Sequence, residues 1–325
     1  MHQIEAQRQQ SRWKFTDPFF EHFQKEGLTG HLVGLAATHT ASATEVTGSS
    51  FDFIEKIALE KARSELCERM TIVELIHSGK TSHSLKDPNC TISRSNGWAA
   101  HPDLANAKAS ACLELLERDR VLRYWYSGRK PKPLSKDLLP FWPVELPDSV
   151  GNRMQLYSLP DPHSDAEVCM AAIVPRPNSD PRFIVHGFGA GLDLEAAIAS
   201  ACRETIQRWA FLYEECAEPG NQNQTNTPDF HQDYLLSPLG QKKLIAWTSG
   251  DLSLGLEIPT PKPLLRECSV EIYSTPLSQI AEARNTLFVC KASHPNALPL
   301  VFGSQPQTVL KWLPNNSARW WHPIP

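Results

Sequence analysis

A short acidic pattern recurs in three long stretches of helical periodicity, and this repeat limits the possible folds more than any other feature. Apolar residues recur three to four positions apart over residues 50–70, 102–124 and 193–215, which predicts three amphipathic helices. Each helix carries a glutamate, then an acid or amide three residues later, followed directly by an arginine. Residues three apart share one face of a helix, so each copy places its polar pair together. The copies are Glu65, Glu68 and Arg69; Glu114, Glu117 and Arg118; and Glu204, Gln207 and Arg208.

Segments with the patterns of β-strands lie between these helices. The 325 residues show no shift in composition, so we predict an α/β (α+β) fold in which mixed sheets pack against long helices. An N-terminal extension over residues 1–45, helical around 18–24, precedes one large domain over residues 46–325. A polar loop is expected over 217–240 and a short helix over 277–283. The expected strands cover residues 31–43, 153–157, 167–174, 183–185, 270–273 and 286–291.

Charge and hydropathy exclude two classes of partner. The net charge is −4 and the pI is about 6.3, which argues against a broad electrostatic hold on nucleic acid. The sequence has no run of 18 apolar residues, so we predict no membrane span. The 8 cysteines form no CxxC motif and the N-terminus is polar. We therefore expect free thiols and a cytoplasmic location.

A glycine-rich segment, Gly187–Gly191, lies between an expected strand and the third helix, where a dinucleotide-binding loop would lie. The third glycine of that motif is replaced by Leu192, and no acidic residue stands clearly at the end of a strand about 20 residues later. The segment therefore argues against a dinucleotide site.

The acidic pairs themselves suggest a cation site. Apolar residues surround each pair, so convergence of the three helices would bring up to five carboxylates together. Such a cluster is costly unless cations neutralise it. Carboxylate oxygens suit Mg²⁺, which also binds nucleotide phosphates, and arginines can bind phosphate directly. The alternative is that each pattern is a solvated helix face with local Glu–Arg pairs of little energetic weight.

Several segments, in the same order along the chain, resemble the YcaO family over about residues 45–325. Ser95–Pro102 and the helix after it are similar to the family's Ser-Asn-Gly-x-Ala loop and Glu-x-x-Glu-Arg helix. Gly187–Ala190, leading to the third helix, resembles the family's later Gly-x-Gly-Ala block, and the first acidic helix also resembles its counterpart. Trp321–Pro325 looks like the proline-rich C-terminus of azoline-forming members, and Leu122–Trp125 resembles the microcin-type cyclodehydratases.

The resemblance implies ATP- and Mg²⁺-dependent modification of a peptide backbone, most specifically cyclodehydration in a ribosomally made precursor. A Cys, Ser or Thr side chain attacks the preceding amide carbonyl, the amide oxygen is phosphorylated, and a thiazoline or oxazoline forms. The resemblance also assigns the C-terminal prolines, Pro323 and Pro325, to substrate positioning or deprotonation. It assigns Mg²⁺ and nucleotide binding to Glu65, Glu68, Glu114, Glu117 and Glu204, and further nucleotide contacts to Arg118 and Gln207.

Three positions depart from the family pattern: Lys61, Asn106 and Ser200. These departures leave two alternatives open, a non-catalytic scaffold that binds a partner enzyme or leader peptide, and a thioamide-forming relative. The resemblance further implies an E1-like or leader-recognition partner, a flavin dehydrogenase that oxidises azolines, and a homodimer.

Overall fold

The computed structural model describes nine ranges of the chain and divides them between two compact units. The first unit comprises residues 1–84, 97–114 and 269–293, and the second comprises residues 85–96, 115–268 and 294–325. Helix α3 (Leu104–Ser127) contributes its first half to the first unit and its second half to the second. The described residues are 12–79, 90–92, 96–138, 146–175, 183–213, 228–252, 263–275, 287–303 and 321–324.

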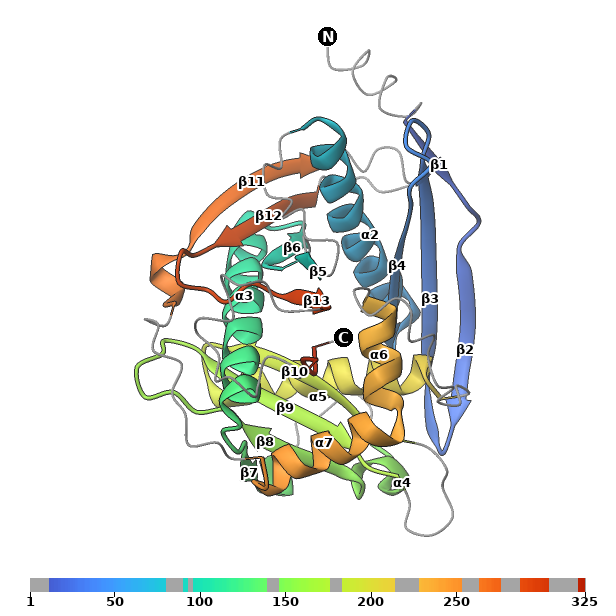
Figure 1. The fold of residues 1–325 in the computed structure, drawn as a ribbon. Coiled ribbons are helices and arrows are strands. Elements are labelled where there is room, and N and C mark those ends of the chain that lie inside the picture. The colour runs from blue at the N-terminus through green and yellow to red at the C-terminus, as the bar shows by residue number, and fades with distance from the viewer. Residues whose placement is uncertain are drawn as a thin grey trace. The chain divides into compact units, whose positions relative to one another are not determined.

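An antiparallel sheet built around β3 forms one side of the first unit (Figure 1). Its strands are β1 (Trp13–Phe15), β2 (Phe19–Lys25), β3 (Leu28–His39) and β4 (Glu45–Asp52). The helix predicted around residues 18–24 is wrong, because this segment is β2 and pairs with residues 28–34. Glu26 and Gly27 both have positive φ angles, 50° and 81°, which suit the two-residue hairpin turn that sets this pairing.

Helix α2 (Glu55–His77) packs on β3 and β4 through a stripe of small and apolar residues that includes Ala58, Ala62 and Leu66. Gly48 of β4 permits the close approach, since a Cβ atom there would lie 2.1 Å from the carbonyl oxygen of Ala62. A three-stranded antiparallel sheet of order β11-β12-β6 completes the unit. Its strands are β6 (Trp98–His101), β11 (Ser269–Thr275) and β12 (Leu287–Ser293).

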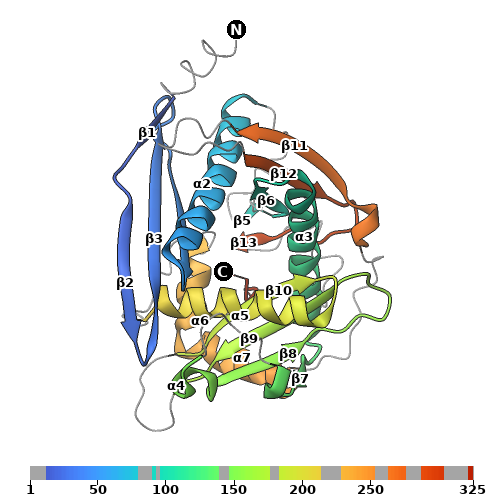
Figure 2. The ribbon, with the colours of Figure 1, turned by 180° about the vertical axis from the view of Figure 1, so that it is seen from behind.

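The second unit centres on an antiparallel sheet of order β10-β9-β8-β7. Helix α5 covers one face of this sheet and α7 lies over the other, as Figures 1 and 2 show from opposite sides. The strands are β7 (Lys132–Leu134), β8 (Met154–Ser158), β9 (Glu167–Ile173) and β10 (Val185–Gly191). The helices are α4 (Asp148–Gly151), α5 (Leu194–Phe211), α6 (Pro228–Leu236) and α7 (Pro238–Ser249), with short 3₁₀ turns at Lys136–Leu138 and Leu265–Glu267. The remaining pair is β5 (Cys90–Ile92) with β13 (Val301–Gly303).

The prediction of a loop over residues 217–240 is wrong from residue 228 onward, where α6 and the start of α7 lie. Phe230, Tyr234 and Leu235 form an apolar cluster that stabilises α6, and the polar composition of the stretch hid this pattern. The short helix predicted over residues 277–283 lies outside the described residues. The other predicted helices and strands are confirmed, and so is the mixed α and β fold class. Two of them have clearly different ends: the helix expected over 50–70 is α2, Glu55–His77, and the strand expected over 183–185 is β10, Val185–Gly191.

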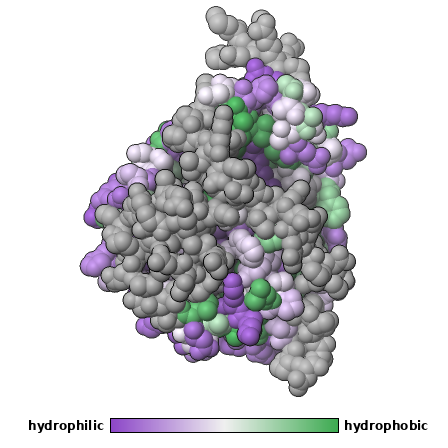
Figure 3. Space-filling view, in the orientation of Figure 1, coloured by the Kyte–Doolittle hydropathy of each residue, from purple (hydrophilic) through white to green (hydrophobic). Residues whose placement is uncertain are grey.

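The described part of the chain contains no helix with the length and hydropathy needed to cross a membrane. On the face shown in Figure 3, hydrophobic residues lie in separate small groups among hydrophilic ones. The boundary at residue 45 stays a prediction.

Candidate functional site

The predicted Mg²⁺- and nucleotide-binding residues are all half-buried at the borders of apolar helix faces. On α5, for example, Glu204 and Gln207 flank the fully buried Thr205 and Ile206. These side chains are therefore neither in the core nor on a fully solvated surface, and their charges remain accessible to a ligand. The first unit holds Glu65, Glu68 and Glu114, and the second holds Glu117, Arg118, Glu204 and Gln207.

Both predicted site glutamates of α2 accept hydrogen bonds from the backbone of neighbouring strands. Glu65 accepts one from the amide of Ser49 in β4, at 2.6 Å, and Glu68 accepts one from the amide of Ala100 in β6, at 2.7 Å. Glu65 also pairs with Arg69 at 2.5 Å, and Arg69 in turn donates to the carbonyl of Thr47 at 2.9 Å. A hydrogen bond from a backbone amide orients the carboxylate that accepts it. The two carboxylates are thus held in fixed orientations.

Helix α5 is pressed against β10 by a stripe of alternate glycines. A Cβ atom at Gly187 would lie 2.7 Å from the amide nitrogen of Thr205, and one at Gly189 would lie 2.2 Å from that of Ala201. A Cβ atom at Gly191 would lie 2.6 Å from the amide nitrogen of Ala197, nearer the N-terminus of the helix. The glycine-rich segment therefore lies within a strand and serves helix packing, which agrees with the argument against a dinucleotide loop.

Arginines of the repeated pattern tie their helices to neighbouring strands. Arg208 of α5 donates to the carbonyl oxygen of His186 in β10, as Arg69 of α2 does to β4. Burial lowers the pKa of Arg208, and the negative charge of Glu204 opposes this shift. The guanidinium groups of Arg69 and Arg208 thus bind the protein itself, and direct binding of phosphate by these arginines stays a prediction.

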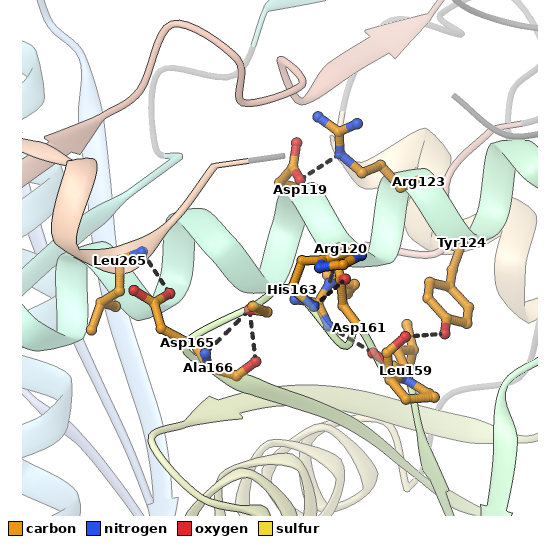
Figure 4. A network of polar contacts seen from close by, with 12 residues as sticks. Asp119, Arg120, Arg123, Tyr124, Leu159, Asp161, His163, Asp165, Ala166 and Leu265 are labelled. Carbon is orange, nitrogen blue, oxygen red and sulfur yellow. Dashed lines mark hydrogen bonds and ion pairs between the residues drawn. The ribbon is translucent and has the colours of Figure 1, made fainter. Parts of the chain in front are cut away.

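A buried polar network holds the second half of α3, which carries Glu117 and Arg118 (Figure 4). Asp119 accepts hydrogen bonds from Arg123 at 2.6 Å and from the amide of Leu298 at 2.8 Å. Burial raises the pKa of Asp119, and the charge of Arg123 opposes this rise. Both residues lie on α3, so rotation of the helix is resisted by their bonds to other segments: the bond from the amide of Leu298 and the bond from Arg123 to the carbonyl of Asn296 at 2.9 Å.

The same network anchors the segment between β8 and β9. Arg120 donates to the carbonyl of Leu159 at 2.8 Å and pairs with Asp161 at 3.7 Å. Tyr124 donates to the carbonyl of Pro160 at 2.7 Å. Asp119, Arg120, Arg123 and Tyr124 thereby fix the position of α3 within the second unit.

The C-terminal segment is buried within the second unit. His186 lies within hydrogen-bond distance of Pro323, with 2.8 Å between Nε2 and the carbonyl oxygen, and Ile324 joins the apolar core. His322 is fully buried, and its ring centroid lies 4.5 Å from that of His231. Pro325 lies outside the described residues.

Burial strongly lowers the pKa of His322, and the charges of His231 and Arg118 add to this shift. Arg118, a predicted nucleotide contact, therefore acts electrostatically on the C-terminal segment. His186, His231 and His322 were not predicted as site residues, because nothing in the sequence around an isolated histidine marks it as buried.

The carboxylate oxygens of the site glutamates are of the type that binds Mg²⁺. Among the described residues, no group of three acidic, histidine or cysteine side chains lies close enough together to hold a metal ion by itself. Mg²⁺ usually takes one or two carboxylates from a protein and completes its shell with water and nucleotide phosphate. Pairs of half-buried glutamates meet that requirement, so their side chains fit the ion.

One of the departures from the family pattern, Lys61, makes a side-chain contact with a neighbouring residue. Lys61 donates to Asp52 at 2.5 Å, and its charge is thus shared with a neighbouring carboxylate. Asn106 lies exposed in the first turn of α3, where its backbone amide donates to the N-cap Asp103 at 2.8 Å. Ser200 is half-buried on α5. None of these three residues lies within the acidic pairs.

Fold and site together define an α+β protein in which the candidate binding groups are acidic side chains on helices. Its glycine-rich segment packs against a helix and does not form a phosphate loop. The sequence matches the family described as YcaO cyclodehydratase, ATP- and Mg²⁺-binding, over residues 42–268. The chain belongs to this family, and the predicted cofactors, ATP and Mg²⁺, are confirmed at that level. No curated protein matches the chain.

Solved structures share the fold at low sequence identity. YcaO from Methanopyrus kandleri, bound with AMPPCP and Mg²⁺, is 13% identical with a TM-score of 0.50, covering 94% of this chain and 93% of that one. A chain of the E. coli microcin synthetase McbBCD complex is 11% identical with a TM-score of 0.54, covering 86% and 87%. The same synthetase with pro-MccB17 bound gives 10% identity and a TM-score of 0.54, covering 87% and 91%.

Proposed function

We propose that this protein uses ATP to modify backbone amides of a peptide, and that the product is a thiazoline or oxazoline made by cyclodehydration. The observation that carries the proposal is the placement of half-buried carboxylates on α2, α3 and α5, with two of them oriented by backbone amides. Family membership supports the ATP-dependent chemistry. The precursor peptide is ribosomally synthesised, and its Cys, Ser or Thr residues are the reacting groups.

The proposed reaction needs positioning and charge neutralisation more than covalent help from the protein. The thiol or hydroxyl of the substrate residue attacks the preceding carbonyl carbon, the amide oxygen takes the γ-phosphoryl group of ATP, and phosphate leaves. One ATP is consumed and the peptide loses one water for each ring. In this proposal Glu65, Glu68, Glu114, Glu117 and Glu204 bind Mg²⁺ and nucleotide, with Arg118 and Gln207 contacting the nucleotide.

The proposal also includes Pro323 and Pro325. A proline ring fixes φ, so these two residues restrict the backbone of the segment that carries them. We propose that this segment positions the substrate side chain or helps to deprotonate it.

A partner protein is proposed to deliver the peptide. The microcin synthetase that shares this fold was solved as a multi-protein complex and also with pro-MccB17 bound, which supports a peptide substrate and a protein partner here. We extend the proposal to an E1-like or leader-recognition partner, a flavin dehydrogenase that oxidises the azolines, a homodimer and a cytoplasmic location.

Calorimetric titration with Mg·ATP tests the site. Glu204→Gln, which keeps the shape of the side chain and removes its charge, should weaken binding by about 10-fold or more, the equivalent of a lost charge-assisted interaction. Glu195→Gln is the matched control, because Glu195 is exposed in the first turn of the same helix. Equal affinities of the two variants would contradict the assignment, and a wild-type protein that binds no Mg·ATP would favour the scaffold alternative.

Mass spectrometry of a reacted peptide tests the reaction. A short Cys-, Ser- or Gly-rich peptide encoded beside this gene is the substrate to use, together with the partner protein. Loss of one water per ring supports cyclodehydration, whereas replacement of oxygen by sulfur identifies a thioamide-forming relative. Glu117→Ala and a chain lacking Ile324 and Pro325 should both lose the reaction, and ring formation that survives in both would contradict the mechanism.

A further inference from the structure

The carbonyl of Pro323 meets a single hydrogen-bond donor in the described part of the chain, and that donor is a buried histidine. His186 lies in β10 with 2% of its surface exposed, and its Nε2 atom is 2.8 Å from the oxygen of Pro323. Only the tautomer with hydrogen on Nε2 can donate this bond. Burial lowers the pKa of His186 to about 3, so the ring is neutral near pH 7.

The histidine is itself held by the helix that carries two predicted nucleotide-binding residues. Arg208 of α5 donates to the backbone carbonyl of His186, and it directly follows Gln207 along that helix. Hydrogen bonds therefore run from α5 through β10 to the C-terminal segment. Each of these contacts lies within the second unit.

Besides this hydrogen bond, the packing of two side chains, Ile324 and Trp321, holds the C-terminal segment in place. Ile324 is 5% exposed and packs in the apolar core, and Trp321 contacts the rings of Phe230 and Tyr234. Proline has no backbone N–H, so the carbonyl is the one backbone group through which residue 323 can be held by a hydrogen bond. A buried carbonyl without a donor is costly, so loss of the histidine would release this point.

We propose that His186 is a positioning residue that holds the C-terminal segment in place through the carbonyl of Pro323. The role in turnover rests on the proposed function, in which that segment positions the substrate. The hydrogen bond itself does not depend on the proposed function. The bond sets the position of the segment relative to β10 and α5, so that substrate meets an ordered segment in each cycle.

Two substitutions of His186 distinguish the effect of losing its hydrogen-bond donor from the effect of losing its aromatic ring. His186→Gln places an amide nitrogen near the former position of Nε2 and can still donate, whereas His186→Phe keeps the ring and cannot donate. His186→Asn is shorter, places its amide near Nδ1, and replaces the phenylalanine variant if that variant does not fold. Circular dichroism and the melting temperature establish that each variant is folded.

Hydrogen exchange of the full-length protein, measured on its C-terminal peptide, reads the bond directly. The amides of His322 and Ile324 should exchange about 10-fold faster in His186→Phe, consistent with the loss of one buried hydrogen bond, and close to the wild-type rate in His186→Gln. Unchanged exchange in His186→Phe would overturn the proposal.

Steady-state kinetics with the precursor peptide reads the positioning role. We expect kcat to fall about 10-fold in His186→Phe with an unchanged KM for ATP, and to recover in His186→Gln. Faster exchange with an unchanged kcat would overturn the positioning role. A wild-type protein that turns over no peptide would refute the proposed function instead, and exchange alone would then decide whether His186 holds the segment.

Discussion

Acid should destabilise the second unit through three buried histidines. Burial lowers the pKa of His186 to about 3 and that of His231 to about 4, and it lowers the pKa of His322 well below its ordinary value. All three are essentially inaccessible to solvent. The folded state therefore holds three neutral imidazoles that become protonated on unfolding once the pH is low.

The sign and size follow from proton linkage. An unfolded histidine titrates near pH 6.5, so above that pH neither state binds the proton and stability is unaffected. Below pH 6.5 the unfolded state binds more protons, and each histidine lowers the free energy of unfolding by about 1.4 kcal/mol per pH unit until its folded pKa is reached. At pH 5.5 the three together cost about 4 kcal/mol, a large part of the 5–15 kcal/mol typical of a folded protein.

Urea unfolding followed by tryptophan fluorescence at about pH 7.5 and 5.5 measures this loss. The raised pKa of Asp119 acts in the opposite direction, so a variant isolates the histidines. In His231→Gln the glutamine can still accept the hydrogen bond from the amide of Gly303. Between about pH 7.5 and 5.5, the free energy of unfolding of this variant should fall by about 1.4 kcal/mol less than that of wild type. The control is His163→Gln, at an exposed position. A total loss below about 1 kcal/mol, or identical pH dependence in His231→Gln and wild type, would refute the reasoning.

Three further substitutions test the packing and charge arguments by chemical denaturation. Arg123→Met leaves the buried Asp119 uncompensated and should cost about 3–5 kcal/mol, with much of the loss recovered when Asp119→Leu is added. Gly189→Ala should cost about 1–3 kcal/mol or more, because its Cβ would lie 2.2 Å from a backbone nitrogen of α5, whereas the control Gly34→Ala meets nothing closer than 3.5 Å and should change stability by less than about 1 kcal/mol. Lys61→Ser should change stability by less than about 1 kcal/mol, because the ion pair of Lys61 with Asp52 is partly exposed and therefore weak. The affinity for Mg·ATP should stay unchanged. A large loss of affinity would show that Lys61 belongs to the nucleotide site.

Local patterns predicted the elements that carry the site. The spacing of apolar residues identified α2, α3 and α5, and Asp103 caps the N-terminus of α3 where the pattern begins. The half-buried position of each acidic pair also followed from its neighbours in sequence. These predictions succeed because helical periodicity and capping depend on residues within one or two turns.

The role of some segments depends on distant partners and could not be read from local patterns. Residues 19–25 have an amphipathic pattern compatible with either type of element, and the helix predicted there was wrong because pairing with β3 decides for a strand. The sequence argued against a phosphate loop at Gly187 and Gly189, but only their contacts with α5 showed that they form a packing stripe. In both cases the deciding contact comes from another element.

By itself, the sequence determined the three acid-bearing helices, the mixed fold class and the family, because each depends on local periodicity or on motifs in a fixed order. Only the tertiary structure decided that Arg69 and Arg208 bind backbone carbonyls, and that His186 meets Pro323. His186 and Pro323 are 137 positions apart in the sequence, and no local pattern marks either residue as a partner of the other. Such contacts arise when packing buries a carbonyl that needs a donor, and that requirement exists only in the folded chain.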